Sequence, residues 1–99
     1  MAKFEIYTDK KGEFRFRLKT GEGQIILASE GYTSKIACDN GIVSVKRNSK
    51  IYDRYLRKQS KDGKHYFVLK ASNGKTIGKS PLFNSKTGLE GGIITLKEE

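Results

Sequence analysis

Residues 12–19 read Gly12-Glu13-Phe14-Arg15-Phe16-Arg17-Leu18-Lys19, and this alternation of apolar and basic side chains decides the fold. Alternation with a period of two is typical of a β-strand that buries one face and exposes the other. The three apolar side chains of the alternating part would point into a core. The three basic side chains, Arg15, Arg17 and Lys19, would share the opposite, outer face.

The same stretch recurs 51 residues later as Gly63-Lys64-His65-Tyr66-Phe67-Val68-Leu69-Lys70. Aligning residues 4–48 with residues 55–99 at this offset gives 13 identical positions in 45 columns without a gap. The chain is therefore a tandem duplication of one β-rich unit. A unit of this length is near the size at which a core of its own becomes marginal. We expect residues 1–99 to form a single compact domain of two repeats (4–48 and 55–99) joined by a basic linker, 49–54.

Each repeat is predicted to be β-β-β-α. A short extended run (4–7 and 55–58) leads through a glycine turn into the alternating strand. A second turn, Glu22-Gly23 or Asn73-Gly74, leads into a third strand (24–29 and 75–80). Asn-Gly is typical of a two-residue type I′ hairpin turn, which needs positive φ. The predicted class is α+β, with an antiparallel sheet or sheets packed with two helices. The sequence leaves open whether the repeats share one sheet or exchange strands between two.

A helix is predicted to close each repeat after Ser34 and Ser85, whose hydroxyl groups suit the N-cap position. One face of each helix then carries apolar residues and a glycine at i, i+3, i+4 and i+7. These residues are Cys38, Gly41, Ile42 and Val45, repeated as Leu89, Gly92, Ile93 and Leu96. Glycine inside a helix costs about 1 kcal/mol relative to alanine. Because it recurs on the buried stripe, we expect the backbone of the sheet to approach each helix closely there.

With the repeats aligned, the residues resemble the bacterial YegP-like family of small proteins of unknown function. The similarity rests on residues 12–19, 23–26, 29–32, 34–35 and 41–46, and on 66–71, 73–74, 85–86 and 92–93 of the second repeat. The second repeat departs from the family pattern at Ser80-Pro81-Leu82-Phe83 and in its glycine-rich helix around 88–92. The resemblance implies a compact α+β tandem domain in the bacterial cytoplasm, and it transfers no catalytic residues.

The chain is strongly basic, with 20 Lys and Arg residues against 11 Asp and Glu residues and a net charge of +9. Such an excess favours an anionic partner such as nucleic acid. The alternative is a basic surface that serves solubility only. No apolar run approaches the length of a membrane span, and Met1 to Glu5 lacks the apolar region of a secretory leader. Together with the single cysteine, these features predict a cytoplasmic protein without membrane contact.

The candidate nucleic-acid site combines the basic outer face of the alternating strand with the basic, aromatic segment 50–58. Its predicted residues are Arg15, Arg17, Lys19, Arg54, Arg57, Lys58 and Tyr66, because basic side chains track phosphates and an exposed tyrosine can stack on a base. The helix starts Ser34-Lys35 and Ser85-Lys86 are weaker candidates for anion binding, since capping alone explains both serines.

Packing is the alternative, and favoured, interpretation of Tyr66 and of Val68, its neighbour on the same face. These two side chains would then lie against the other repeat or a second subunit. Tyr52, Tyr55 and Leu56 could equally hold the two repeats together. A homo-oligomer formed through Tyr66 and Val68 or through edge strands is therefore the second functional hypothesis.

An enzyme is not expected. Cys38 shares its column with Leu89 on the buried stripe, which predicts a core thiol and not a nucleophile. His65, the only histidine, shares its column with the inward Phe14, and no third group is in place to orient a dyad. No Cys or His cluster has the spacing of metal ligands. The sequence therefore predicts no catalytic residue, no metal and no cofactor.

Overall fold

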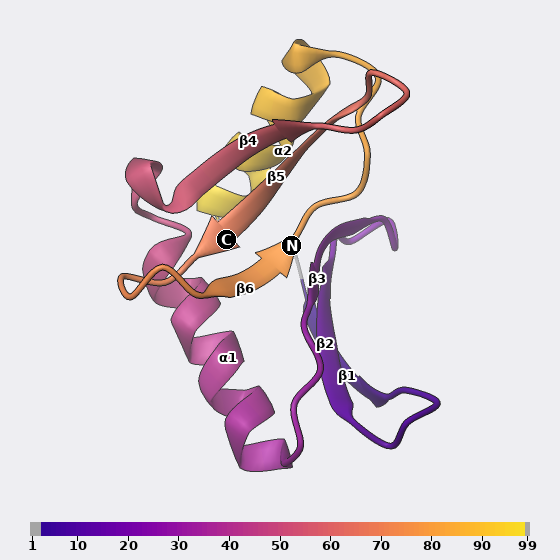
Figure 1. Ribbon diagram of the computed structural model, residues 1–99, viewed down its shortest axis with the longest axis vertical. Helices are drawn as coiled ribbons and strands as arrows, with labels where there is room; N and C mark the ends of the chain where they lie inside the picture. The colour runs from indigo at the N-terminus through magenta and orange to yellow at the C-terminus, as the bar shows by residue number, and fades with distance from the viewer. Residues whose placement is uncertain (1–2, 99) are drawn as a thin grey trace.

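The computed structural model describes residues 3–98 (Figure 1). Met1, Ala2 and Glu99 lie outside these residues, so the very start of the chain and the last position of the second repeat are not described. The first repeat contains β1 (Lys3–Thr8), β2 (Phe14–Lys19), β3 (Ile25–Ser29) and α1 (Lys35–Asn48). A 3₁₀ turn, η1 (Tyr52–Arg54), leads into β4 (Tyr55–Gln59), β5 (His65–Lys70), β6 (Thr76–Lys79) and α2 (Lys86–Lys97).

All six strands form one antiparallel sheet in the order β1-β2-β3-β6-β5-β4. The two repeats join where β3 pairs with β6, through Ala28 opposite Lys79 and Ser29 opposite Gly78. A Cβ atom added at Gly78 would lie 2.9 Å from the Leu27 side chain, so this junction needs glycine. The predicted α+β class is confirmed, and the repeats share one sheet.

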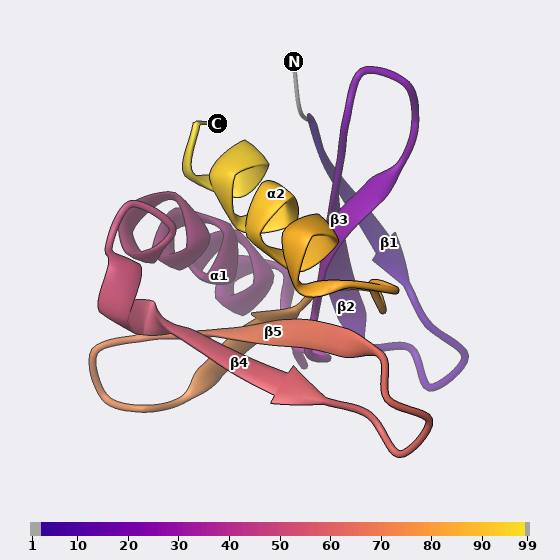
Figure 2. The same ribbon diagram turned by 90° about the horizontal axis from the view of Figure 1, so that it is seen from above.

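Both helices lie on the same side of the sheet, inside the angle between its two halves (Figure 2). Helix α1 packs on β2 of its own repeat and also on β5 and β6 of the other repeat. Phe16 and Phe67 are fully buried on the helix-bearing, inner face, where they meet side chains such as Val45 and Leu96. The two repeats therefore contribute to one core.

The helix starts are as predicted. The Ser34 hydroxyl accepts a 3.1 Å hydrogen bond from the amide of Ala37, and the Ser85 hydroxyl accepts one of 3.1 Å from Gly88. Cys38, Val45 and Leu96 are buried along the predicted stripes.

The prediction of a type I′ turn at Asn73-Gly74 is wrong. Gly74 has a φ of +84°, but among the described residues no residue other than glycine has a positive φ. Ala71 both donates to the Lys75 carbonyl and accepts from the Gly74 amide, which makes a three-residue loop that ends in a glycine bulge. The Asn73 side chain accepts from the Lys75 amide at 3.0 Å, so asparagine serves here through its side chain and does not adopt positive φ.

The expectation that sheet backbone approaches the helix glycines is also wrong. A Cβ atom added at Gly41 would meet the Tyr32 ring, with Cζ 2.8 Å away, and one added at Gly92 would lie 2.7 Å from Cζ of Phe83. Tyr32 and Phe83 occupy the same column of the two repeats. Tyr32 pairs through its backbone with Phe14, and Phe83 pairs in the same way with His65. This pairing positions each ring over the helix of its own repeat.

Candidate nucleic-acid interface

The face of the sheet that carries no helix is called the outer face here. Directly opposed residues of antiparallel strands point to the same side, so the strand register identifies its members. One row crosses all six strands through Glu5, Arg17, Ala28, Lys79, Val68 and Leu56. The outer face is therefore continuous from the first repeat to the second.

On the first-repeat half, the three predicted basic residues lie together, and carboxylates partly neutralise them. Arg15 bonds Asp9 with 2.7 Å between Nε and Oδ2. Arg17 lies 2.6 Å and Lys19 3.4 Å from the carboxylate of Glu5 on β1. These hydrogen bonds, from Arg15 to Asp9 and from Arg17 to Glu5, hold the pKa of each carboxyl below its ordinary value. The arginines of the alternating strand therefore present little unbalanced charge.

On the second-repeat half, the lysines keep their charge. Lys58 lies directly opposite the half-buried Tyr66, and the ammonium of Lys79 lies 4.9 Å from the centre of the Tyr66 ring. Among residues 3–98, no carboxylate lies within 4.0 Å of Lys58, Lys70 or Lys79. Val68 is only 7% exposed, so it packs within this chain. Unpaired positive charge thus surrounds an aromatic ring on this half.

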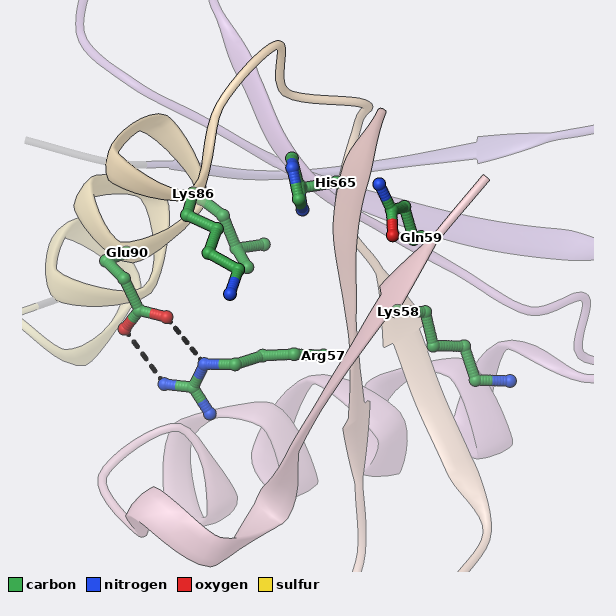
Figure 3. A pocket seen from close by; sticks show the side chains of 7 residues that line it. Arg57, Lys58, Gln59, His65, Lys86 and Glu90 are labelled. Carbon is green, nitrogen blue, oxygen red and sulfur yellow. Dashed lines mark hydrogen bonds and ion pairs between the residues drawn. The ribbon is translucent and has the colours of Figure 1, made fainter. Parts of the chain in front are cut away.

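Two predicted members lie apart from this surface. Arg57 stands opposite the buried Phe67, on the inner face, where Nε and Nη2 donate to the Glu90 carboxylate at 2.6 Å and 2.9 Å (Figure 3). Arg54 donates to the side-chain oxygen of Asn48 at 3.0 Å. The outer face therefore brings together Arg15, Arg17, Lys19, Lys58 and Tyr66, but it does not include Arg54 or Arg57.

The aromatic residues of the linker region divide between structure and surface. Tyr55 is buried, and its hydroxyl donates to the Ser49 carbonyl at 2.8 Å, which ties β4 to the end of α1. Burial raises the pKa of Tyr55. Tyr52 is 59% exposed and lies under the guanidinium of Arg57, 4.8 Å from its ring centre. Leu56 belongs to the outer-face row.

The remaining candidates have ordinary surroundings in the part of the chain that the structure describes. Lys35 pairs with Asp39 at 3.3 Å, and Lys86 lines a pocket beside His65. Cys38 is fully buried, and desolvation raises the pKa of its thiol. Residues 3–98 contain no group of three or more potential metal ligands, and none of their helices is long and apolar enough to cross a membrane.

Sequence reasoning missed Lys79. Its strand β6 holds only four residues with a bulge in its pairing, so it lacks the alternation that reveals an outer face. Only the junction of β3 with β6 places Lys79 between the two halves.

Comparison with known proteins places the chain in a family. The family model described as "Domain of unknown function (DUF1508)" matches residues 9–55 and again residues 60–99. The chain belongs to the DUF1508 family. The two matches agree with the two repeats, and the resemblance to YegP-like proteins is confirmed.

Relatives of this DUF1508 protein match it over most of their length. The UPF0339 protein YegP of Escherichia coli K12 is 44% identical over 94 residues, which cover 95% of this chain and 86% of YegP. A UPF0339 protein from the ptx operon 5′ region of Stutzerimonas stutzeri is 51% identical over 95% of this chain and 85% of its own. The solution structure of the UPF0339 protein SO3888 from Shewanella oneidensis is 40% identical, with a TM-score of 0.93 over 99% of this chain and 83% of that one. These names supply a fold and a family but no activity.

Proposed function

We propose that this DUF1508 protein is a non-catalytic module that binds nucleic acid on the outer face, weakly and with little sequence preference. The charge of that face carries the proposal. The strand register places seven basic side chains and the carboxylate of Glu5 on it, while Asp9 and Glu13 lie beside Arg15 at its margin. The basic residues are Lys3, Arg15, Arg17, Lys19, Lys58, Lys70 and Lys79.

The second-repeat half of the face supports the proposal best. Lys58 and Lys79 lie beside the Tyr66 ring, and Lys70 lies on the same face four residues further along β5. Lysines that face phosphates release condensed counterions, which gives affinity without reading sequence. An aromatic ring beside them offers a stacking partner to an unpaired base. A single strand can use both features, so we expect it to bind more tightly than a duplex.

The test is fluorescence anisotropy with labelled single-stranded and duplex DNA and RNA across a range of salt concentrations. The triple variant Lys58→Glu, Lys70→Glu, Lys79→Glu should weaken binding by at least about tenfold, since each contact to a phosphate adds to the salt-dependent term. The slope of log K against log salt should flatten by about 2 units for a single strand, at about 0.7 for each of three lost contacts.

The matched control applies the same change of charge to loop residues, as Lys10→Glu, Lys11→Glu, Lys61→Glu. These side chains lie in the exposed turns after β1 and β4. If both triple variants weaken binding equally, net charge alone is responsible and the outer face is not the site. The pair Arg15→Gln, Arg17→Gln should have a smaller effect than the lysine variant, because both arginines already bond carboxylates.

Self-association is the second candidate, since β1 and β4 form the two edges of the sheet. An edge strand can pair with another chain through its free backbone groups. Lys3 on β1 and Lys58 on β4 oppose this, because charged residues on edge strands disfavour such pairing. Val68 is covered within the chain and offers little surface. Light scattering at high protein concentration decides the matter, and a monomer throughout would exclude this candidate.

A further inference from the structure

A second polar site lies at the other side of β4, between β4, β5 and the start of α2. It is a solvent-open pocket of about 330 Å³ with Leu89 in its wall (Figure 3). Arg57, His65, Lys86 and Glu90 line it from these three elements. We propose that this pocket binds a small oxyanion of the phosphate class, with the positive charges of Lys86 and Arg57 and the imidazole of His65 around it.

Arg57 is held in place before any ligand arrives. Its guanidinium makes two hydrogen bonds to Glu90 and lies 4.8 Å from the centre of the Tyr52 ring. The bonds to Glu90 use Nε and Nη2 of the guanidinium. A positioned guanidinium loses little freedom when it binds a phosphate, which it recognises through its planar fork of N–H groups.

Lys86 and His65 supply donors that the fold itself does not use. Within residues 3–98, neither side chain makes a hydrogen bond or an ion pair within 4.0 Å. The Lys86 ammonium extends into the pocket toward Arg57, and His65 lines the same pocket from β5 (Figure 3). Glu90 carries one negative charge against the two positive charges of Arg57 and Lys86, so one positive charge of this group remains unbalanced. Lys86 also begins α2, where the helix dipole disfavours a cation unless an anion lies nearby.

The first repeat shows that the fold does not require a polar lining. In its corresponding columns Ile6 replaces Arg57, and Phe14 replaces His65. Phe14 packs against the core there. Lys35 matches Lys86 but is paired with Asp39 at 3.3 Å. The same backbone therefore forms around Ile6 and Phe14 in the first repeat and around Arg57 and His65 in the second. Because folding does not require the polar residues, their presence in the second repeat points to a ligand.

This site borders the outer face. Lys58 is among the residues that line the pocket, although its side chain leaves β4 in the direction opposite to Arg57 (Figure 3). Lys70 and Lys79 do not line the pocket, so loss of nucleic-acid binding in Lys70→Glu, Lys79→Glu reports on the outer face, and loss of phosphate binding in Lys86→Ala reports on the pocket.

The test is a titration of the ¹⁵N-labelled protein with inorganic phosphate, followed by two-dimensional NMR against sodium chloride at matched ionic strength. The expected result is a saturable shift of the amide signals of Arg57, His65, Lys86 and Glu90. Lys86→Ala should weaken phosphate binding about tenfold, as expected for the loss of one charge-assisted hydrogen bond. His65→Phe, which installs the residue of the first repeat, should weaken it at least threefold, about 0.7 kcal/mol.

Lys35→Ala is the matched control, because Lys35 begins α1 as Lys86 begins α2. It should leave the affinity within about twofold, a difference of only 0.4 kcal/mol. The spectrum of each variant reports whether it is folded, and the two pocket variants test the site independently. Shifts that grow linearly without saturation, shifts spread equally over both repeats, or an equal loss in Lys35→Ala would overturn the proposal.

Discussion

Replacing Gly92 by alanine should destabilise the protein, although alanine is the better helix former. In the middle of α2 this exchange would by itself stabilise the helix by about 1 kcal/mol. The new methyl carbon, however, would lie 2.7 Å and 3.3 Å from two ring carbons of Phe83. The ring cannot move away freely, because it stacks on the fully buried Phe67 with 6.5 Å between ring centres. Overpacking costs about 1–3 kcal/mol, so the free energy of unfolding should fall by about 0–2 kcal/mol.

Gly91 supplies the matched control, since a Cβ atom added there has nothing within 4 Å. Gly91→Ala should raise the free energy of unfolding by up to about 1 kcal/mol. Two identical exchanges at adjacent positions should then differ by about 1–3 kcal/mol. Urea unfolding followed by circular dichroism measures both, and the slope against urea should stay constant.

A double-mutant cycle identifies the cause. Phe83→Leu removes the tip of the ring that Gly92→Ala would contact. In the Phe83→Leu background, alanine at position 92 should lose most of its cost, because residues in contact do not contribute additively. If Gly92→Ala stabilises the unaltered protein as much as Gly91→Ala does, the ring is not the reason for the glycine.

Three further predictions concern buried polar groups. Ser80→Ala should lower the free energy of unfolding by about 1–3 kcal/mol in urea, because the buried amide of Phe67 loses the hydroxyl that accepts from it at 2.9 Å; a change below 0.5 kcal/mol would contradict this. Tyr55→Phe should cost about 1 kcal/mol at neutral pH through its lost bond to Ser49. Burial raises the pKa of Tyr55, so the unfolded chain releases the hydroxyl proton at a lower pH than the folded protein does. The free energy of unfolding should therefore fall as pH rises above about 10, and it should fall more steeply in the unaltered protein than in Tyr55→Phe. Parallel curves of unfolding free energy against pH would contradict the raised pKa. Because Cys38 is buried, it should react with a thiol reagent only as fast as the protein unfolds, and rapid labelling of the folded protein would refute its burial. Cys38→Ala should leave nucleic-acid affinity unchanged.

The local structure was predictable because it follows from short-range sequence patterns that occur in each repeat. Alternation through Phe16 and Leu18 places a strand and its buried face, and an N-cap serine followed by the apolar stripe places each helix. The hairpins were predictable as hairpins, but their turn type was not. Asparagine is compatible with a positive φ and also with a side-chain bond to its own backbone, and only the Asn73 bond to Lys75 distinguishes the two.

The junction of the repeats was not predictable from such patterns. It depends on two residue pairs between β3 and β6, Ala28 with Lys79 and Ser29 with Gly78, which are 51 and 49 residues apart in the chain. Nothing local distinguishes one shared sheet from two that exchange strands. The same limit applies to the outer face, because the sequence alone does not show that Glu5 lies beside Arg17 and Lys19, or that Lys79 lies beside Tyr66. The charge of a surface depends on these neighbours as much as on its basic residues.

The duplication also separates what the fold requires from what it allows. Most positions identical in both repeats have a structural reason in both. The turn glycines such as Gly12 have positive φ, and Ser29 and Ser80 each accept from the buried amide of a phenylalanine. Gly41 and Gly92 each lie beneath a ring. Because these structural requirements are the same in both repeats, they explain why the residues are identical in both without any functional role.

Four lysine columns are also identical, namely Lys10 and Lys61, Lys19 and Lys70, Lys35 and Lys86, and Lys46 and Lys97. The last of these has a structural reason, because Lys46 and Lys97 lie in the last turns of α1 and α2, where the helix dipole favours a cation. Each of these two ammonium groups also lies 5.7 Å from the centre of an aromatic ring. In two of the other columns only the lysine of the second repeat lacks a carboxylate partner within the described residues. Lys19 and Lys35 pair with Glu5 and Asp39, whereas Lys70 lies unpaired on the outer face and Lys86 begins α2, where the helix dipole disfavours positive charge. Cations at Lys70 and Lys86, where folding gains little from them, are the pattern expected if an anion outside the chain selects them. The outer face and the pocket beside Lys86 are where that anion should be sought.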